Sequence, residues 1–160
     1  MSIEDKSLID GTPTYLASGD PARTVTDFAF HTVSAADYSP TWLNNLAEDV
    51  TLEGSMMNGA VQGADAALAI VGYIRTLYEH QEFSFAGPYG ENGFLEDYTA
   101  RVRGEQIGNV VLVTRNAAGQ AQRIVGNYRP RSTLLLLSRL IGEQLAGTPY
   151  GEYFATSAPE

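Results

Sequence analysis

The spacing of apolar residues changes from a helical repeat to a strand repeat after residue 80, and this change constrains the fold most. Between Asp65 and His80, apolar side chains recur every three or four positions, as on one face of an amphipathic helix. Beyond this helix the apolar positions alternate with a period of two and are interrupted by turn residues. The alternation predicts four strands, at Glu82–Gly87, Phe94–Arg103, Ile107–Arg115 and Gln122–Arg129. A helix followed by a meander of strands indicates an α+β domain.

Shorter elements are predicted before this core. Residues 1–22 are rich in glycine, proline and acidic side chains without a sustained period, which indicates an N-terminal arm. Helical spacing predicts a first helix at Arg23–Ser34. Ser39 and Pro40 have the pattern of a second helix start, and that short helix is expected to reach Glu48. Val50–Glu53 then alternates as a strand.

Two further elements are predicted after Pro130. Ser132 has the position of an N-cap for a leucine-rich helix, Thr133–Leu145, which could cover a pocket mouth or a dimer interface. Residues 147–160 are expected to form a tail. The length of 160 residues fits a single domain, which we place at residues 23–146.

Charge and composition exclude several classes of function. A formal net charge of −9 repels phosphate backbones, so we expect no nucleic-acid partner. The apolar run Leu134–Leu137 is far shorter than the ~20 residues of a membrane span. Together with the absence of a visible secretory signal, this predicts a cytoplasmic protein without membrane contact. Because the chain has two histidines and no cysteine, we expect neither a metal site nor a cofactor.

Three short passages resemble the nuclear transport factor 2-like superfamily, in its SnoaL-like and ketosteroid-isomerase-like branch. Leu46–Gly54 resembles the passage that enters the family's first strand, Val61–Ala66 the start of its long helix, and Arg123–Tyr128 its last strand. The resemblance implies a curved mixed β-sheet wrapped around N-terminal helices, which forms a conical apolar pocket in a cystatin-like fold. The C-terminal helix is then an addition. Members of this superfamily include isomerases, dehydratases, polyketide cyclases and non-catalytic modules.

The positions that carry catalysis in ketosteroid isomerases differ in this chain. In those enzymes the residue after the first-strand glutamate is the aspartate base, and Gly54 occupies that position here. The oxyanion-hole aspartate falls near Val111, and the first-helix tyrosine falls near Ala29. The resemblance therefore implies the fold and a pocket without implying the steroid-isomerase mechanism.

The strand Phe94–Arg103 carries the first candidate for catalysis. Glu96 is the only carboxylate on the face that also holds Phe94, Tyr98, Ala100 and Val102. Burial there would raise its pKa toward neutrality, where a carboxyl group works as a general acid or base. Alternatively, Glu96 lies near the strand end and reaches water.

A second candidate pair lies on the predicted first helix. Asp27 and His31 are four residues apart and share one face of that helix, where a carboxylate could fix the tautomer of an acid–base histidine. The alternative is a solvated helix pair.

Six side chains are predicted to line the pocket, although such aromatic residues often belong to the core instead. The predicted lining consists of Trp42, Met56, Tyr73, Phe85, Tyr98 and Tyr128. Gly126 lies between inward-facing positions, where a missing side chain either leaves room for a ligand or permits a bulge.

Two functions follow from these patterns. The first is binding of a small, mostly apolar molecule, with cofactor-free isomerisation, dehydration or cyclisation through Glu96, His31 and Asp27. The second is a non-catalytic structural or small-subunit module that binds a protein partner through the leucine-rich helix and the opposite sheet face. That face gathers Arg101, Arg103, Arg123 and Arg129, and it could dock on an acidic surface or face solvent. In either case we expect a homodimer.

Overall fold

The computed structural model describes residues 32–33 and 40–155 of the chain. Most of the predicted arm and first helix, with Asp27 and His31, therefore lies outside the described residues. Thr32–Val33 forms a short strand, β1, so the prediction of a helix up to Ser34 is wrong at this end. β1 pairs antiparallel with Glu82 and Gln81 of strand β4. Two β-branched residues favour extended backbone, and an edge strand offers them unpaired backbone groups.

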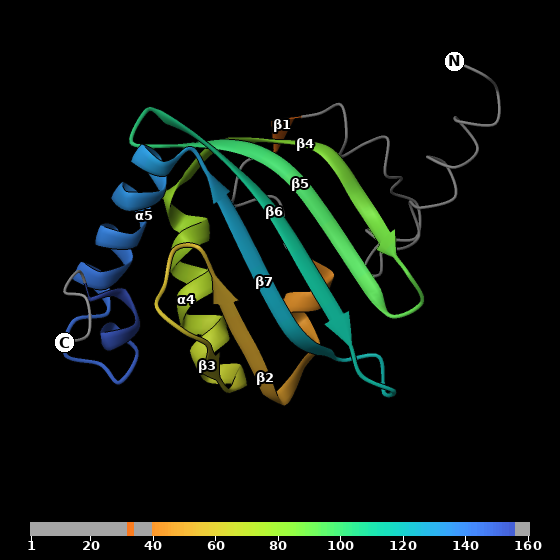
Figure 1. The fold of residues 1–160 in the computed structure, drawn as a ribbon. Coiled ribbons are helices and arrows are strands. Elements are labelled where there is room, and N and C mark those ends of the chain that lie inside the picture. Colours follow the sequence, from red (N-terminus) through yellow and green to blue (C-terminus); the bar gives the residue numbers. More distant parts are fainter. Residues whose placement is uncertain (1–31, 34–39, 156–160) are drawn as a thin grey trace, which may run out of the picture.

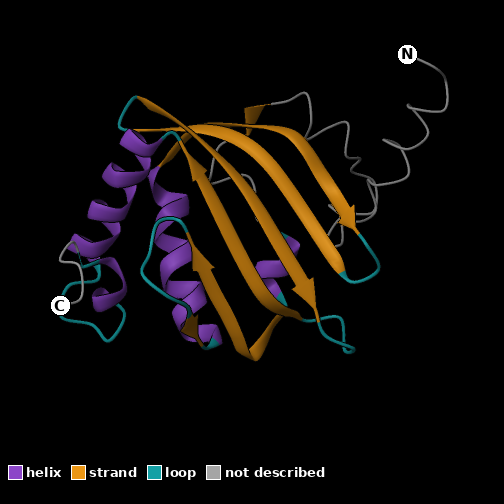
Figure 2. Ribbon diagram, viewed as in Figure 1, coloured by secondary structure: helices purple, strands orange, loops and turns teal. Residues whose placement is uncertain are grey.

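The core of the fold is a strongly curved sheet with the strand order β1-β4-β5-β6-β7-β2-β3 (Figures 1 and 2). Neighbouring strands are antiparallel, except that β2 and β7 run parallel, so the sheet is mixed. The strands after β1 are β2 (Leu46–Gly54), β3 (Val61–Gln62), β4 (Tyr78–Tyr89), β5 (Gly93–Val102), β6 (Glu105–Arg115) and β7 (Ala121–Arg129). The predicted α+β class and the meander of four long strands are confirmed.

Helix α4 (Ala64–Leu77) lies across the concave face of the sheet and buries Ala67, Ile70 and Ile74. It ends earlier than predicted, because the backbone becomes extended at Tyr78 and β4 begins there without a loop. His80 consequently lies in β4 rather than in the last helical turn.

Helix α5 (Arg131–Gln144) packs beside the sheet against β6, β7 and α4 (Figure 1). It starts after Pro130 without a side-chain cap, so the expected Ser132 cap is wrong. A 3₁₀ helix, η2 (Gly151–Phe154), packs against α5 and buries Phe154. Within the described part of the chain, no helix is long and apolar enough to cross a membrane.

The predicted helix from Pro40 to Glu48 is much shorter in the structure. A 3₁₀ helix, η1 (Thr41–Asn44), forms one turn and buries Trp42 and Leu43. β2 begins at Leu46, because the chain there pairs with β7. Pairing with the sheet therefore takes precedence over the local helical signal.

Two bulges in β4 decide which of its side chains face inward. Register shifts occur between Glu79 and Glu82 and between Phe83 and Phe85. The first bulge directs Gln81 inward, where it is 4% exposed. After the second bulge, Phe85 is 40% exposed and Ala86 is buried instead. A bulge adds one residue and reverses the alternation beyond it.

On the convex face of the sheet, two of the four predicted arginines form ion pairs. Arg123 contacts Glu53 at 2.6 Å, and Arg129 contacts Asp97 at 3.1 Å. All four side chains are partly exposed, so each pair contributes little to stability. Each ion pair offsets one positive charge, so this face is less positive than its four arginines predicted from the sequence.

Candidate functional site

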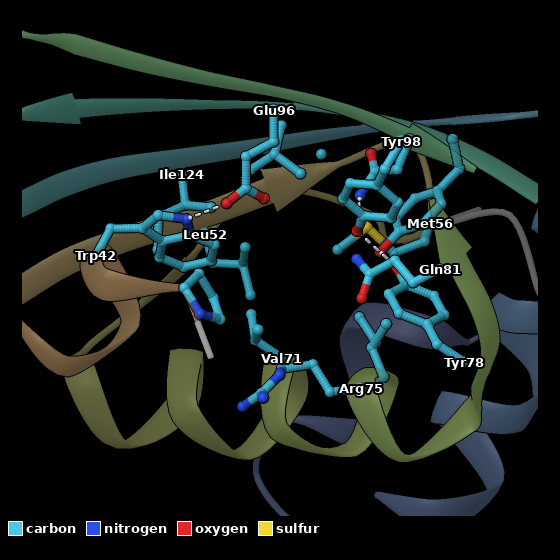
Figure 3. Close-up of a pocket in the computed structure, with 16 residues that line it drawn as sticks. Trp42, Leu52, Met56, Val71, Arg75, Tyr78, Gln81, Glu96, Tyr98 and Ile124 are labelled. Atoms are coloured by element: carbon cyan, nitrogen blue, oxygen red, sulfur yellow. Dashed lines mark hydrogen bonds between the residues drawn. The ribbon is translucent and has the colours of Figure 1, made fainter. Parts of the chain in front are cut away.

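A small cavity lies between the concave face of the sheet and α4 (Figure 3). Its volume is about 40 Å³. A single water molecule needs on the order of 10–15 Å³ by this measure, so the cavity accepts a small group or one end of a larger molecule. Its apolar wall includes Trp42, Leu52, Met56, Val71, Val111 and Ile124.

Strand register places the polar side chains of the cavity in two adjacent rows. Tyr98 of β5 lies opposite Asn109 of β6, which lies opposite Tyr128 of β7. Glu96 and Gly126 belong to the next row, on either side of Val111. Residues two apart on a strand share a face and lie about 7 Å apart, so Glu96 and Tyr98 point into the same cavity.

Glu96 is the carboxylate of the cavity wall. Only 2% of its surface is exposed, and the indole Nε1 of Trp42 donates a hydrogen bond of 3.1 Å to its Oε1. Trp42 reaches it from η1 and lies at the end of the cavity away from Tyr78 and Tyr98 (Figure 3). The inward orientation of Glu96 that strand alternation predicted is confirmed.

Three tyrosine hydroxyls form a chain, called here the hydroxyl network, at the other end of the cavity. The hydroxyl of Tyr78 lies 2.8 Å from that of Tyr98 and 2.7 Å from that of Tyr128. Nδ2 of Asn109 donates to the Tyr98 hydroxyl at 2.9 Å. Burial raises the pKa of Tyr128 to about 12, and burial raises the pKa of Tyr78 and of Tyr98 well above 10. These phenols therefore stay protonated and act as hydrogen-bond donors at neutral pH.

The other amide atom of Asn109 lacks a partner. Asn109 is 2% exposed, and its Oδ1 is the one buried side-chain polar atom within the described residues that has no hydrogen bond. Asn109 lines the cavity, so this acceptor is available to whatever occupies it. Buried acceptors without a partner are rare in native proteins and deserve an explanation.

Two glycines lie opposite one another on β2 and β7, and one of them, Gly126, lines the cavity. A Cβ on Gly54 would lie 2.2 Å from the Gly126 carbonyl oxygen, so the strands approach too closely for any side chain there. A Cβ on Gly126 would instead meet Asn109 Oδ1 at 3.6 Å and Tyr128 at 3.5 Å, which are ordinary contacts. The absence of a side chain at Gly126 leaves open space beside Asn109.

The chain matches no protein-family model and no curated protein sequence. Its structure is similar to an uncharacterised bacterial protein with a cystatin-like fold from Silicibacter pomeroyi, with a TM-score of 0.61 and 20% identity over 66% of this chain and 74% of the other. It is also similar to a steroid delta-isomerase from Pseudomonas aeruginosa, with a TM-score of 0.60 and 19% identity over 65% and 77% of the two chains. A designed protein with a curved β-sheet covers 88% of this chain at a TM-score of 0.50 and 15% identity.

The fold is cystatin-like, of the nuclear transport factor 2 type. The fold that the resemblance in the sequence implied is therefore confirmed. In this cystatin-like domain the concave side of the sheet holds the cavity, and none of the residues that line it comes from α5 or η2. Neither element therefore covers the cavity mouth in the described structure.

The cystatin-like sheet brings five of the predicted site residues together around the cavity and leaves two others away from it. Those that line the cavity are Trp42, Met56, Glu96, Tyr98 and Tyr128. Tyr73 is half-buried on α4 and Phe85 is exposed beyond the second bulge, and neither lines the cavity. Asp27 and His31 lie outside the described residues.

The sequence analysis missed several polar side chains of the cavity, namely Tyr78, Gln81, Asn109 and Arg75. Asn109 had a detectable signal, because it is the one polar residue among the inward positions of the strand Ile107–Val113. Tyr78 lies within the range that the sequence predicted as a helix, and Gln81 faces inward because of a bulge. No group of three or more metal-ligating side chains is placed together within residues 40–155.

Replacing Tyr78 with phenylalanine tests the hydroxyl network. The change removes the central hydroxyl and leaves that of Tyr128 without its partner, so the free energy of unfolding should fall by about 1–3 kcal/mol. Urea denaturation measures this change. The matched control is Tyr73→Phe, whose hydroxyl lies outside the network and which should change stability by less than ~0.5 kcal/mol. Equal effects of the two variants would contradict a structural role for the network.

Proposed function

We propose that this domain binds a small, mostly apolar molecule in the cavity and that Glu96 exchanges a proton with it. The reaction class would be a cofactor-free isomerisation, dehydration or cyclisation. One observation carries the proposal: a carboxylate that is 2% exposed faces a cavity on an otherwise apolar stretch of wall.

Glu96 is almost completely removed from water. Removing a carboxylate from water costs several kcal/mol unless partners compensate for it, and proteins seldom bury glutamate without a use or a partner. The Trp42 hydrogen bond holds Oε1 in place without neutralising the charge. A fixed carboxylate in an apolar site is the usual form of a general acid or base.

Glu96 and the hydroxyl network lie at different ends of the cavity and would have different roles in the reaction. For a bound carbonyl compound, Glu96 would take a proton from the carbon next to the carbonyl, and the released electron pair would move to the oxygen. The hydroxyl network at the other end offers protonated donors for that oxygen. Returning the proton to a different carbon completes an isomerisation and leaves Glu96 unchanged.

The similarity to a steroid delta-isomerase supports isomerisation as the class of reaction for this fold. The position of the base differs from the one that the sequence resemblance implied. Gly54 has no side chain and no room for one, whereas Glu96 of β5 supplies a carboxylate to the same concave face. We assign the proton transfer to Glu96 for this reason.

Exchange of carbon-bound protons tests this function without knowledge of the natural substrate. Cyclopentanone is incubated with the protein in D₂O, and the loss of its α-proton signal is followed by NMR. The proposal predicts faster exchange with the protein than with an equal concentration of Glu96→Gln. Identical rates for the protein and for buffer, at ketone concentrations where the protein spectrum shows binding, would contradict it.

A further inference from the structure

We propose that the ligand of this cavity carries a hydroxyl group that lies over Gly126, donates to Oδ1 of Asn109 and accepts from the hydroxyl network. This inference rests on the proposed function and specifies the substrate class of the same site. It follows from one unpaired acceptor, one unpaired donor and the space between them.

The unpaired acceptor is Oδ1 of Asn109. Nδ2 of Asn109 donates to the Tyr98 hydroxyl, which leaves Oδ1 as the amide atom without a hydrogen-bond partner. Because the side chain is 2% exposed, bulk water does not supply the missing donor. A cavity occupant with an O–H or N–H group would.

The unpaired donor follows from counting protons in the hydroxyl network. Three phenols supply three hydroxyl protons, and the two contacts between their oxygens use two of them. The contact with Asn109 uses an amide proton instead. One phenolic proton is therefore left over in the network, on Tyr78, Tyr98 or Tyr128. The raised pKa of each phenol keeps this proton in place at neutral pH.

The open space above Gly126 adjoins the Asn109 amide and the Tyr128 ring. The position that a Cβ would occupy there lies 3.6 Å from Asn109 Oδ1 and 3.5 Å from the Tyr128 ring. We place the ligand hydroxyl in this space, within hydrogen-bond distance of Oδ1. Glu96 lies in the same row of the sheet as Gly126, so a ligand held there also lies near the carboxylate.

A single ligand hydroxyl can donate to Asn109 Oδ1 and accept the phenolic proton that is left over in the hydroxyl network. A carbonyl oxygen only accepts, so it would leave Asn109 Oδ1 unpaired, and an apolar group would leave both the acceptor and the donor unpaired. Alcohols, phenols and enols all present the required O–H.

Three small probes of similar shape test the inference by NMR titration of the full-length ¹⁵N-labelled protein. They are cyclopentanol, cyclopentanone and methylcyclopentane. The alcohol makes one more hydrogen bond than the ketone and leaves no buried acceptor, so it should bind about tenfold more tightly. In Asn109→Leu, a variant of similar shape without the amide, the ratio of alcohol to ketone affinity should fall to about one.

The outcomes separate this inference from the proposed function. Equal affinities for alcohol and ketone in the unmodified protein would overturn the hydroxyl inference and leave the cavity as a binding site. A preference for the alcohol that persists in Asn109→Leu would overturn the assignment of the acceptor. Absence of binding by all three probes would overturn both proposals. Should Asn109→Leu not fold, Gly126→Ala replaces it, because its methyl group fills the assigned hydroxyl position and should abolish the alcohol preference.

Discussion

Glu96→Gln is expected to slow the protein-catalysed α-proton exchange of cyclopentanone by about 10²–10⁴-fold, the usual contribution of a positioned general base. Glutamine has nearly the shape of glutamate, and its Oε1 can still accept the hydrogen bond from Trp42. It has no carboxylate to take up a proton. The fold and the binding of cyclopentanone should therefore be retained, which far-UV circular dichroism and NMR titration measure alongside the exchange rate.

Glu53→Gln is the matched control for this prediction. Glu53 also lies on a strand and carries a carboxylate, but its side chain is 36% exposed and pairs with Arg123 on the opposite face of the sheet. The exchange rate of this variant should equal that of the unmodified protein. If Glu96→Gln retained the full rate, or if both variants lost it equally, Glu96 would not be the base.

The two facing glycines of β2 and β7 are expected to respond in opposite directions to the same substitution. Gly54→Ala places a methyl group 2.2 Å from the backbone oxygen of Gly126, so the strands must separate. We expect a loss of about 2–3 kcal/mol in the free energy of unfolding, as for other overpacked sites. Gly126→Ala meets only ordinary contacts, and the reduced entropy of its unfolded chain should raise stability by about 0.4–1 kcal/mol.

Urea denaturation of both glycine variants checks this prediction. Because Gly54 and Gly126 are partners in the strand register, each variant is the control for the other. A Gly54→Ala protein as stable as the unmodified one would show that β2 and β7 are not as close as described. A strongly destabilised Gly126→Ala would show that the space beside Asn109 is not open.

The sequence predicted the sheet better than the helices. The period of two along Phe94–Val102 places Glu96 and Tyr98 on the buried face, and the structure agrees. The helical signal before β2 and at the end of α4 was misleading, because residues at both places pair with neighbouring strands. Strand pairing depends on residues far away in the chain, so local periodicity does not reveal it.

The error at Phe85 has a specific cause. Strict alternation puts Phe83 and Phe85 on the same face, and the bulge between them turns Phe85 to the surface. Nothing in the local composition marks this bulge, because Ser84 is compatible with regular strand structure. The same kind of bulge near His80 brings Gln81 into the cavity.

The candidate site was predicted in part. Glu96 was found because a lone carboxylate on an apolar strand face is conspicuous. The hydroxyl network was not found, since Tyr78, Tyr98 and Tyr128 come from three strands and meet only through the register of the curved sheet. The unpaired Oδ1 of Asn109 is likewise a property of the packed structure.

The most direct test of the cavity as a small-molecule site is an NMR titration of the Asn109 side-chain amide signal with cyclopentanol. It compares the unmodified protein with Gly126→Ala. The account predicts a saturable shift of this signal in the unmodified protein and no shift in Gly126→Ala at the same concentrations, while both proteins stay folded. The same shift in both proteins, or binding that leaves the Asn109 signal unchanged, would contradict it.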